Sequence, residues 1–192
     1  NGYILKPTNF DPSKRYPVVM SQYSGPGSQS VLDKWTIDWE YYLVSKGFIV
    51  ACVDGRGTGG RSRAYETSVY MQLGKLETED QVAGAEYMRT LPYVDDKHIG
   101  IYGWSYGGYE TLMAMSTSNG TYQAGVAIAP VTDWRYYDTI YAERFMRTPN
   151  ENNEGYEQSA PITHAEKLKG DLLIISGTAD DNVHYLNTLQ YS

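Results

Sequence analysis

Short apolar runs alternate along the chain with stretches of helical pattern. Five runs have the length of buried strands, at residues 16–22, 48–53, 98–102, 123–129 and 171–176. Helical patterns occur at residues 32–45, 77–90 and 109–116, and the second of these begins with acidic residues, which the helix dipole favours there. The opening residues resemble the tail of one more strand, and residues 133–165 are expected to be irregular or short-helical. The alternation predicts an α/β domain with a mostly parallel sheet flanked by helices.

The loops that follow the predicted strands are the expected place for a site. Active sites in open α/β sheets form at the carboxyl ends of the strands. That rule selects five loops, which we expect to converge on one cleft: residues 23–27, 54–60, 103–109, 130–141 and 177–184.

The third of these loops carries the strongest chemical signal. Residues 103–109 read Gly-Trp-Ser-Tyr-Gly-Gly-Tyr and contain the pattern Gly-x-Ser-x-Gly centred on Ser105. The pattern alone occurs by chance in many proteins, but here a predicted strand precedes it and a predicted helix follows it. This is the context of a nucleophile elbow, a sharp turn that exposes the hydroxyl and points backbone N–H groups at the same spot. Glycine suits positions 103 and 107 because a Cβ would clash at such a turn. Ser105 is therefore the candidate nucleophile.

Composition narrows the class of protein. The 192 residues suffice for one domain with a core. A net charge of −7 argues against nucleic acid as the main partner, because the basic footprint of such proteins is missing. No apolar run approaches the roughly 18 residues of a membrane span. The single cysteine, Cys52, excludes an internal disulfide, and neither a metal nor a cofactor is expected.

An elbow serine needs a base, an acid that orients the base, and donors for the oxyanion. Asp180 suits the acid because it follows a predicted strand, but spacing alone does not separate it from Asp181. A plain turn with an aspartate as helix N-cap is a further alternative. The three histidines are His98, His164 and His184, and none fits the order Ser, Asp, His with the base on a separate loop. Either the chemistry differs or the histidine lies outside these residues.

Several separated motifs resemble the dipeptidyl peptidase IV branch of the prolyl oligopeptidase family, in the order of that family. They are residues 54–59 (DGRGTG), 73–74 with 79–81 (LG and EDQ), 104–109 (WSYGGY), 130–144 (PVTDW, YD and YAER) and 177–184 (GTADDNVH). With residue 23 they extend over nearly the whole chain. The resemblance implies an α/β-hydrolase fold and a serine exopeptidase that releases N-terminal X-Pro or X-Ala dipeptides through an acyl-enzyme on Ser105.

The resemblance also implies a role for each matching residue. Ser105 would attack the scissile carbonyl, and Asp180, the first of the aspartate pair, would orient the histidine. The backbone N–H of Tyr106 and the hydroxyl of Tyr23 would form the oxyanion hole. Asn182 would hydrogen-bond a substrate carbonyl. The pocket for the residue before the cleaved bond, where aromatic faces bury a proline ring well, would be lined by Tyr106, Val131, Trp134, Tyr137, Tyr141 and Val183.

The chain departs from the family at both ends. In that family the catalytic histidine follows one more strand beyond the position of His184, and a β-propeller belongs to the N-terminal part. We therefore expect residues 1–192 to be a partial hydrolase domain, truncated at both ends, with the β-propeller and the C-terminal histidine-bearing segment absent. Such a chain is expected to be inactive alone, because Ser105 has no base.

Partners and location follow from the resemblance alone. It implies a peptide substrate with Pro or Ala at the second position, a homodimer of the full-length form, and a periplasmic, cell-surface or secreted location. Two alternatives stay open. One is an α/β-hydrolase esterase or acylpeptide hydrolase, and the other is a non-catalytic interaction domain that kept the scaffold. The presence of Ser105, Asp180 and Tyr23 together favours an enzyme.

Overall fold

Six strands form one mixed sheet in the computed structural model, which describes residues 1–35 and 38–192. The strands are β1 (Gly2–Leu5), β2 (Tyr16–Ser21), β3 (Ile49–Val53), β4 (Val94–Trp104), β5 (Ala124–Ile128) and β6 (Asp171–Ile175). Their order across the sheet is β1-β3-β2-β4-β5-β6, with β1 antiparallel to β3 and all other neighbours parallel. The five predicted strands and the strand at the opening residues are all confirmed, as is the mostly parallel sheet.

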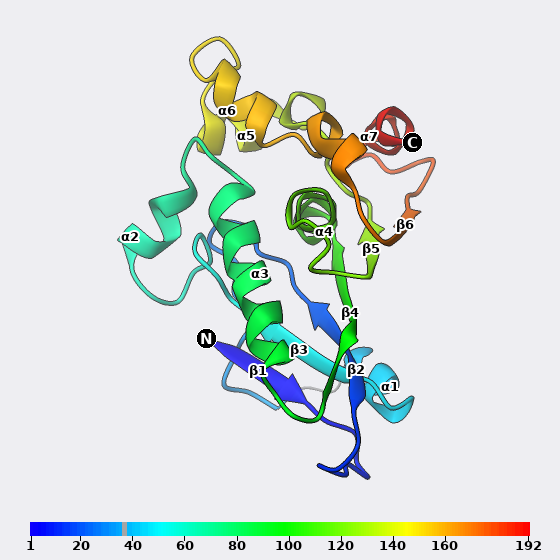
Figure 1. Cartoon of the computed structure of the whole chain (residues 1–192). Coiled ribbons are helices and arrows are strands. Elements are labelled where there is room, and N and C mark those ends of the chain that lie inside the picture. The colour runs from blue at the N-terminus through cyan, green and yellow to red at the C-terminus, as the bar shows by residue number, and fades with distance from the viewer. Residues whose placement is uncertain (36–37) are drawn as a thin grey trace.

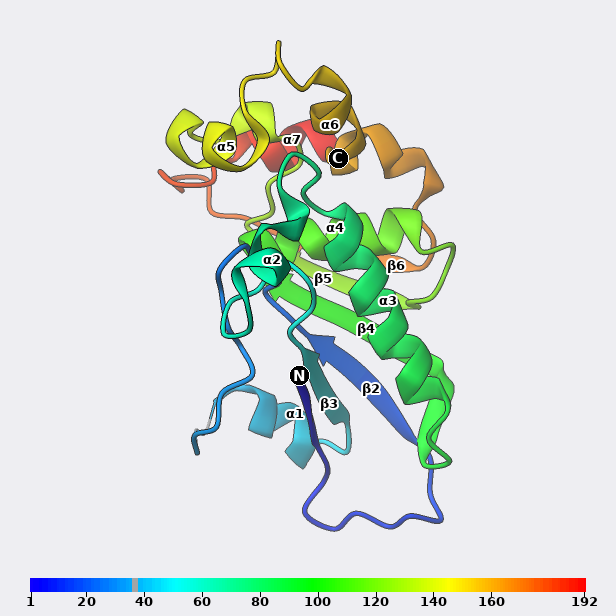
Figure 2. The same cartoon turned by 90° about the vertical axis from the view of Figure 1, so that its left-hand side faces the viewer.

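Helices cover both faces of this sheet. They are α1 (Glu40–Ser45), α2 (Arg63–Glu66), α3 (Lys75–Arg89), α4 (Tyr106–Thr117), α5 (Thr139–Met146), α6 (Asn153–Gln158) and α7 (Leu186–Tyr191), with 3-10 segments η1 (Thr67–Val69), η2 (Trp134–Tyr136) and η3 (Pro161–Lys167). Helices α3 and α4 lie along one face and α1 lies on the other (Figure 1). Figure 2 shows α5, α6 and α7 gathered above one end of the sheet. The short elements between β5 and β6 confirm the irregular segment predicted for residues 133–165.

The main core lies between the sheet and the two long helices. Buried side chains from β2, β3, β4, α3 and α4 form it: Val18, Met20, Ile49, Ala51, Ala85, Met88, Ile99, Ile101, Ala114 and Met115. Strand β3 is buried along nearly its whole length and is a continuous apolar run, as expected of a strand covered on both faces, whereas β4 and β5 alternate between buried and more exposed residues. The edge strand β6 instead exposes Leu173 and Ile175. Within the described residues, no helix has the length and apolar character needed to cross a bilayer.

The helix predicted for residues 32–45 is wrong in its first part. Residues 32–35 are not helical, residues 36–37 lie outside the described residues, and α1 begins only at Glu40. The buried carboxylate of Asp54 accepts the backbone N–H groups of Ser30 at 3.1 Å and Val31 at 2.8 Å, which holds the approaching chain in a loop. Trp35, 81% exposed, offers no buried face on which a helix could pack.

Removal of the Asp54 carboxylate should destabilise the fold. In Asp54→Ala the two loop N–H groups lose their acceptor, which costs about 1–3 kcal/mol for a half-buried group. We expect a lower midpoint of thermal unfolding for the variant, measured by circular dichroism on the full-length gene product. Asp33→Ala, which removes an exposed carboxylate from the same loop, is the matched control. Equal midpoints for the two variants would show that the Asp54 contacts do not hold the loop.

Candidate active site

Ser105 sits at the turn between β4 and α4 with a backbone conformation that few residues adopt. Its φ is 55° and its ψ is −118°. Its N–H donates to the carbonyl of Ile128 at 2.8 Å, and its carbonyl accepts the N–H of Tyr109 at 3.0 Å. A positive φ at a residue other than glycine is strained, and the surrounding structure must hold the residue in that conformation. The predicted strand, tight turn and helix around Ser105 are therefore confirmed.

Three stretches of backbone meet around this turn. A Cβ on Gly103 would lie 2.3 Å from the carbonyl oxygen of Gly107, and one on Gly107 would lie 2.5 Å from the carbonyl oxygen of Gln22. The Gln22 side chain stabilises this close approach, because its Nε2 donates to the Gly107 carbonyl at 2.8 Å. Only glycine fits at positions 103 and 107, and the loop after β2 is thereby fixed against the elbow.

This contact brings Tyr23 and Tyr106 together, as the sequence predicted. Tyr23 lies two residues beyond the end of β2, and its ring centroid lies 6.3 Å from that of Tyr106. Gly25 packs on both rings, because a Cβ there would lie 2.6 Å from Tyr23 Cε1 and 3.3 Å from Tyr106 Cγ. Tyr106 is the first residue of α4, a position whose N–H has no acceptor inside the helix. A free backbone donor therefore follows the half-buried Ser105 directly, and the ring of Tyr23 lies beside that of Tyr106.

A cluster of aromatic rings extends from Tyr106. The Trp134 ring lies 5.4 Å from Tyr106 and stacks on Tyr141 at 5.8 Å between centroids. Tyr137 lies 5.4 Å from Tyr141 and 6.0 Å from Trp134. Val131 and Val183 are buried in the same cluster. Tyr137 also donates from its hydroxyl to Asn182 Oδ1 at 2.8 Å. The structure therefore brings together all the residues that the sequence predicted for the pocket.

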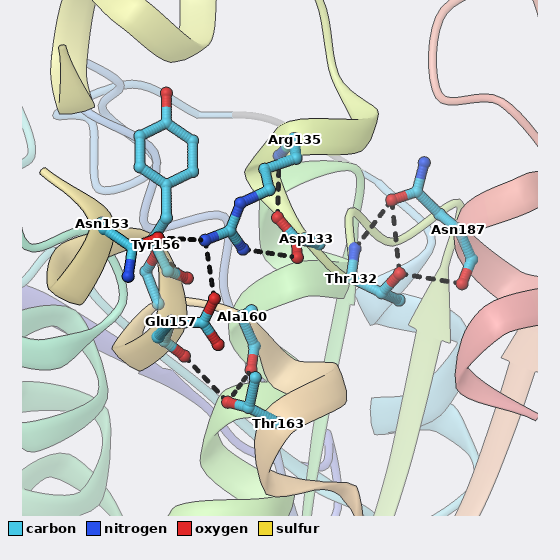
Figure 3. A network of polar contacts seen from close by, with 10 residues as sticks. Thr132, Asp133, Arg135, Asn153, Tyr156, Glu157, Ala160, Thr163 and Asn187 are labelled. Atoms are coloured by element: carbon cyan, nitrogen blue, oxygen red, sulfur yellow. Dashed lines mark hydrogen bonds and ion pairs between the residues drawn. The ribbon is translucent and has the colours of Figure 1, made fainter. Parts of the chain in front are cut away.

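Polar contacts hold the pocket loop in place (Figure 3). The Thr132 N–H donates to Asn187 Oδ1 at 2.9 Å, and the Thr132 hydroxyl donates to the Asn187 carbonyl at 2.8 Å, which ties the loop to α7. On the other side Arg135 bridges Asp133 at 3.0 Å and Glu157 of α6 at 2.7 Å. The loop that carries Trp134 is therefore fixed between two helices rather than left to side-chain packing alone.

Asp180 lies on the loop after β6, where the prediction placed it. Its Oδ1 accepts the backbone N–H groups of Asn182 and Val183, both at 3.0 Å. The carboxylate thus shapes the turn that presents these two residues to the pocket. It is not a helix N-cap, because α7 begins at Leu186. The neighbouring Asp181 is exposed. The role of Asp180 toward a histidine stays a prediction.

None of the three histidines contacts Ser105 in the part of the chain that the structure describes. His98 lies inside β4 and pairs with Asp95 at 2.7 Å, so it does not begin the strand. His164 Nε2 lies 2.9 Å from the carbonyl oxygen of Gln158. His184 is exposed on the loop ahead of α7.

The sequence missed Glu77, a buried carboxyl behind the aromatic cluster. The prediction treated the first acidic residues of α3 as complements of the helix dipole, yet Glu77 is only 1% exposed. Its Oε1 accepts the hydroxyl of Tyr106 at 2.8 Å. Burial raises the pKa of Glu77 to about 7. The signal was present in the spacing, because Glu77, Gln81, Ala85 and Met88 follow one another at helical intervals on the buried face.

A separate cavity of about 740 Å³ lies between α3, α4 and α6. None of the predicted site residues lines it. This cavity is therefore separate from the cluster around Ser105.

Comparisons with known proteins place the chain among peptidases. A model of the prolyl oligopeptidase family matches residues 35–192. "Probable dipeptidyl-aminopeptidase B" of Ajellomyces capsulatus (strain H88) is 50% identical over 188 residues, which are 96% of this chain and 20% of that protein. The protein of the same name from Metarhizium robertsii is 46% identical over 189 residues, again 96% of this chain and 20% of the relative. The chain thus spans about a fifth of the length of these curated relatives.

A solved structure agrees with the sequence matches. The crystal structure of Porphyromonas gingivalis dipeptidyl peptidase 4 superposes with a TM-score of 0.97 at 58% identity, over 99% of this chain and 27% of that chain. The α/β-hydrolase fold expected from the sequence is confirmed by this similarity and by the sheet order.

Burial of Glu77 should make stability depend on pH. Its pKa rises from 4.5 to about 7 on folding, so the unfolded chain loses its proton first as the pH increases. The folded state therefore loses stability between these values, by about 3 kcal/mol in total. Glu77→Gln has no such proton, and its unfolding temperature relative to wild type should rise from about pH 5 to about pH 8.

The control for this experiment is Glu166→Gln, which changes an exposed glutamate. Thermal scans of the full-length gene product at several pH values give the comparison. A difference between Glu77→Gln and wild type that stays constant with pH would mean that Glu77 titrates normally in the folded protein.

Proposed function

This chain belongs to the prolyl oligopeptidase family, and we propose that it forms the catalytic core of a serine dipeptidyl peptidase. The proposed reaction releases X-Pro and X-Ala dipeptides from the N-termini of peptides. One observation carries this proposal: the strained Ser105 stands directly beside a pocket of aromatic rings that begins with the next residue, Tyr106. The similarity to two dipeptidyl-aminopeptidases B and a dipeptidyl peptidase 4 supports the same reaction.

The reaction would proceed through a covalent intermediate on the serine. Ser105 Oγ attacks the carbonyl carbon of the second substrate residue, and its proton passes to a base. The carbonyl oxygen becomes an oxyanion that accepts hydrogen bonds from the Tyr106 N–H and the Tyr23 hydroxyl. Collapse expels the shortened peptide as an amine, which takes up the proton. Water then gives a proton to the same base and attacks the ester carbonyl, and Ser105 Oγ leaves and takes up that proton as the dipeptide is released.

The pocket suits a small apolar ring. The half-buried Tyr137 and Tyr141 pack against the buried Trp134, Val131 and Val183, so the proposed pocket is built of apolar and aromatic side chains. A proline ring gains from burial against such faces, and alanine fits the same space with fewer contacts. Asn182 uses its amide oxygen for the Tyr137 hydroxyl, which leaves its amide nitrogen as the donor for a substrate carbonyl.

The general base is proposed to be a histidine outside residues 1–192. His98 and His164 are engaged elsewhere, and His184 stands only four residues after Asp180 in the same loop. The relatives are about five times longer than this chain, so they have ample length for that residue. The homodimer and the periplasmic, cell-surface or secreted location implied by the resemblance stay predictions.

Replacement of the nucleophile should abolish turnover. The full-length gene product is expected to hydrolyse Gly-Pro 4-nitroanilide, and Ser105→Ala should lower kcat by about 10⁶-fold because no acyl-enzyme forms. Release of nitroaniline measures the rate. Ser45→Ala, which changes a serine on the surface of α1, is the matched control and should keep full activity. Wild-type-like turnover by Ser105→Ala would refute the assignment of the nucleophile.

Removal of the Tyr23 hydroxyl should slow the chemical step. Tyr23→Phe keeps the ring beside Tyr106 but removes one of two oxyanion donors, so kcat should fall about 10²–10³-fold with little change in KM. Steady-state kinetics on Gly-Pro 4-nitroanilide separate the two parameters. Tyr42→Phe, on an exposed tyrosine of α1, is the control. A rise in KM with kcat unchanged would contradict a role in the transition state.

A further inference from the structure

A buried hydrogen bond joins the pocket to the helix behind it. Tyr106 belongs to the aromatic cluster of the pocket, and its buried hydroxyl donates to Glu77 Oε1 at 2.8 Å. Both side chains are almost fully buried. Glu77 belongs to the first turn of α3, and Tyr106 begins α4. The contact thus fixes the far end of a ring whose backbone adjoins the nucleophile.

The groups that face Glu77 come from three helices. On α4 these are Tyr106, Tyr109 and the fully buried Glu110, and on α5 Tyr141 lies within electrostatic reach. On α3 itself Asp80 contributes a further negative charge. Burial raises the pKa of both glutamates and of the tyrosines. Glu77 therefore keeps its proton at pH values at which an exposed glutamate has already lost it.

Packing alone does not fix the Tyr106 ring. Its aromatic neighbours meet it at tilted or edge-on angles: 40° for Tyr23, 70° for Tyr109 and 36° for Trp134. Such contacts favour burial of the ring but allow a wide range of ring orientations. A hydrogen bond at the phenol is directional and sets where the ring lies. Loss of the acceptor would leave the hydroxyl buried without a partner, which favours movement of the ring.

We propose that Glu77 is a positioning residue that sets proline selectivity by holding the Tyr106 ring as the pocket wall beside Ser105. This inference rests on the proposed function, because it concerns the same pocket. Glu77 itself touches no substrate in this arrangement. Its removal should therefore affect the residue preference of the pocket more than the acyl transfer itself.

The test compares two substrates on the full-length gene product. The ratio of kcat/KM for Gly-Pro over Gly-Ala 4-nitroanilide reports on the pocket, whereas a general loss of folded enzyme lowers both values equally. Glu77→Leu should lower this ratio about tenfold. Glu77→Gln keeps an amide oxygen as acceptor for the Tyr106 hydroxyl and should stay within about twofold of wild type.

A double-mutant cycle shows whether the hydrogen bond carries the effect. Tyr106→Phe keeps the ring and removes only the hydroxyl, so it should lower the ratio as Glu77→Leu does. The double variant should be no worse than either single variant, because both remove the same interaction. Glu110→Leu is the matched control, since it removes a neighbouring buried carboxyl with no hydrogen bond to Tyr106. Its ratio should equal that of wild type.

The outcomes separate this inference from the proposed function. If wild type cleaves both amides and Glu77→Leu or Tyr106→Phe leaves the ratio unchanged, the inference is overturned and the proposed function stands. Additive losses in the double variant overturn it as well. If Glu77→Leu does not fold, an unchanged ratio in Tyr106→Phe still overturns it. A wild-type protein that cleaves neither amide overturns both proposals.

Discussion

The close approach of three backbone stretches around Ser105 is the constraint on which the rest of the site depends. The end of β4, the start of α4 and the loop after β2 leave no room for a Cβ at Gly103 or Gly107. Ser105 is held at positive φ by this contact and by its bond to the Ile128 carbonyl. The same contact places Tyr23 beside Tyr106 at the turn. The candidate nucleophile and the proposed oxyanion donors therefore depend on the same backbone contact and not on independent loops.

The aromatic cluster of the pocket is positioned by the same turn and by helix α4. Helix α4 starts at the nucleophile, so its first ring, Tyr106, is both a neighbour of Ser105 and part of the buried aromatic cluster. A buried acid on α3 is an unfavourable arrangement for stability, because the charged form loses its hydration. Its hydrogen bond to Tyr106 is the proposed function of this arrangement. Burial of the Glu77 carboxyl lowers the stability of the fold at neutral pH, and its hydrogen bond holds the ring of Tyr106 in place.

Local patterns predicted the strands and the elbow because both depend on neighbours in sequence. The apolar runs are long enough to predict strands without tertiary information, and the glycines around Ser105 predict the turn. The start of α1 was mispredicted because the contact that prevents it comes from Asp54, more than twenty residues away. Glu77 was missed because its partner lies on another helix. The pocket residues were identified through the resemblance to a known family, whereas their mutual geometry required the tertiary structure.

The central claim is that Ser105 is a nucleophile served by the adjoining pocket. The most direct measurement is fluorophosphonate labelling of the full-length gene product, with the modified peptide identified by mass spectrometry. We expect a phosphonate adduct on Ser105, formed more slowly when a Gly-Pro dipeptide occupies the pocket. Labelling of another residue, no labelling at all, or labelling at Ser105 that the dipeptide does not slow would contradict it.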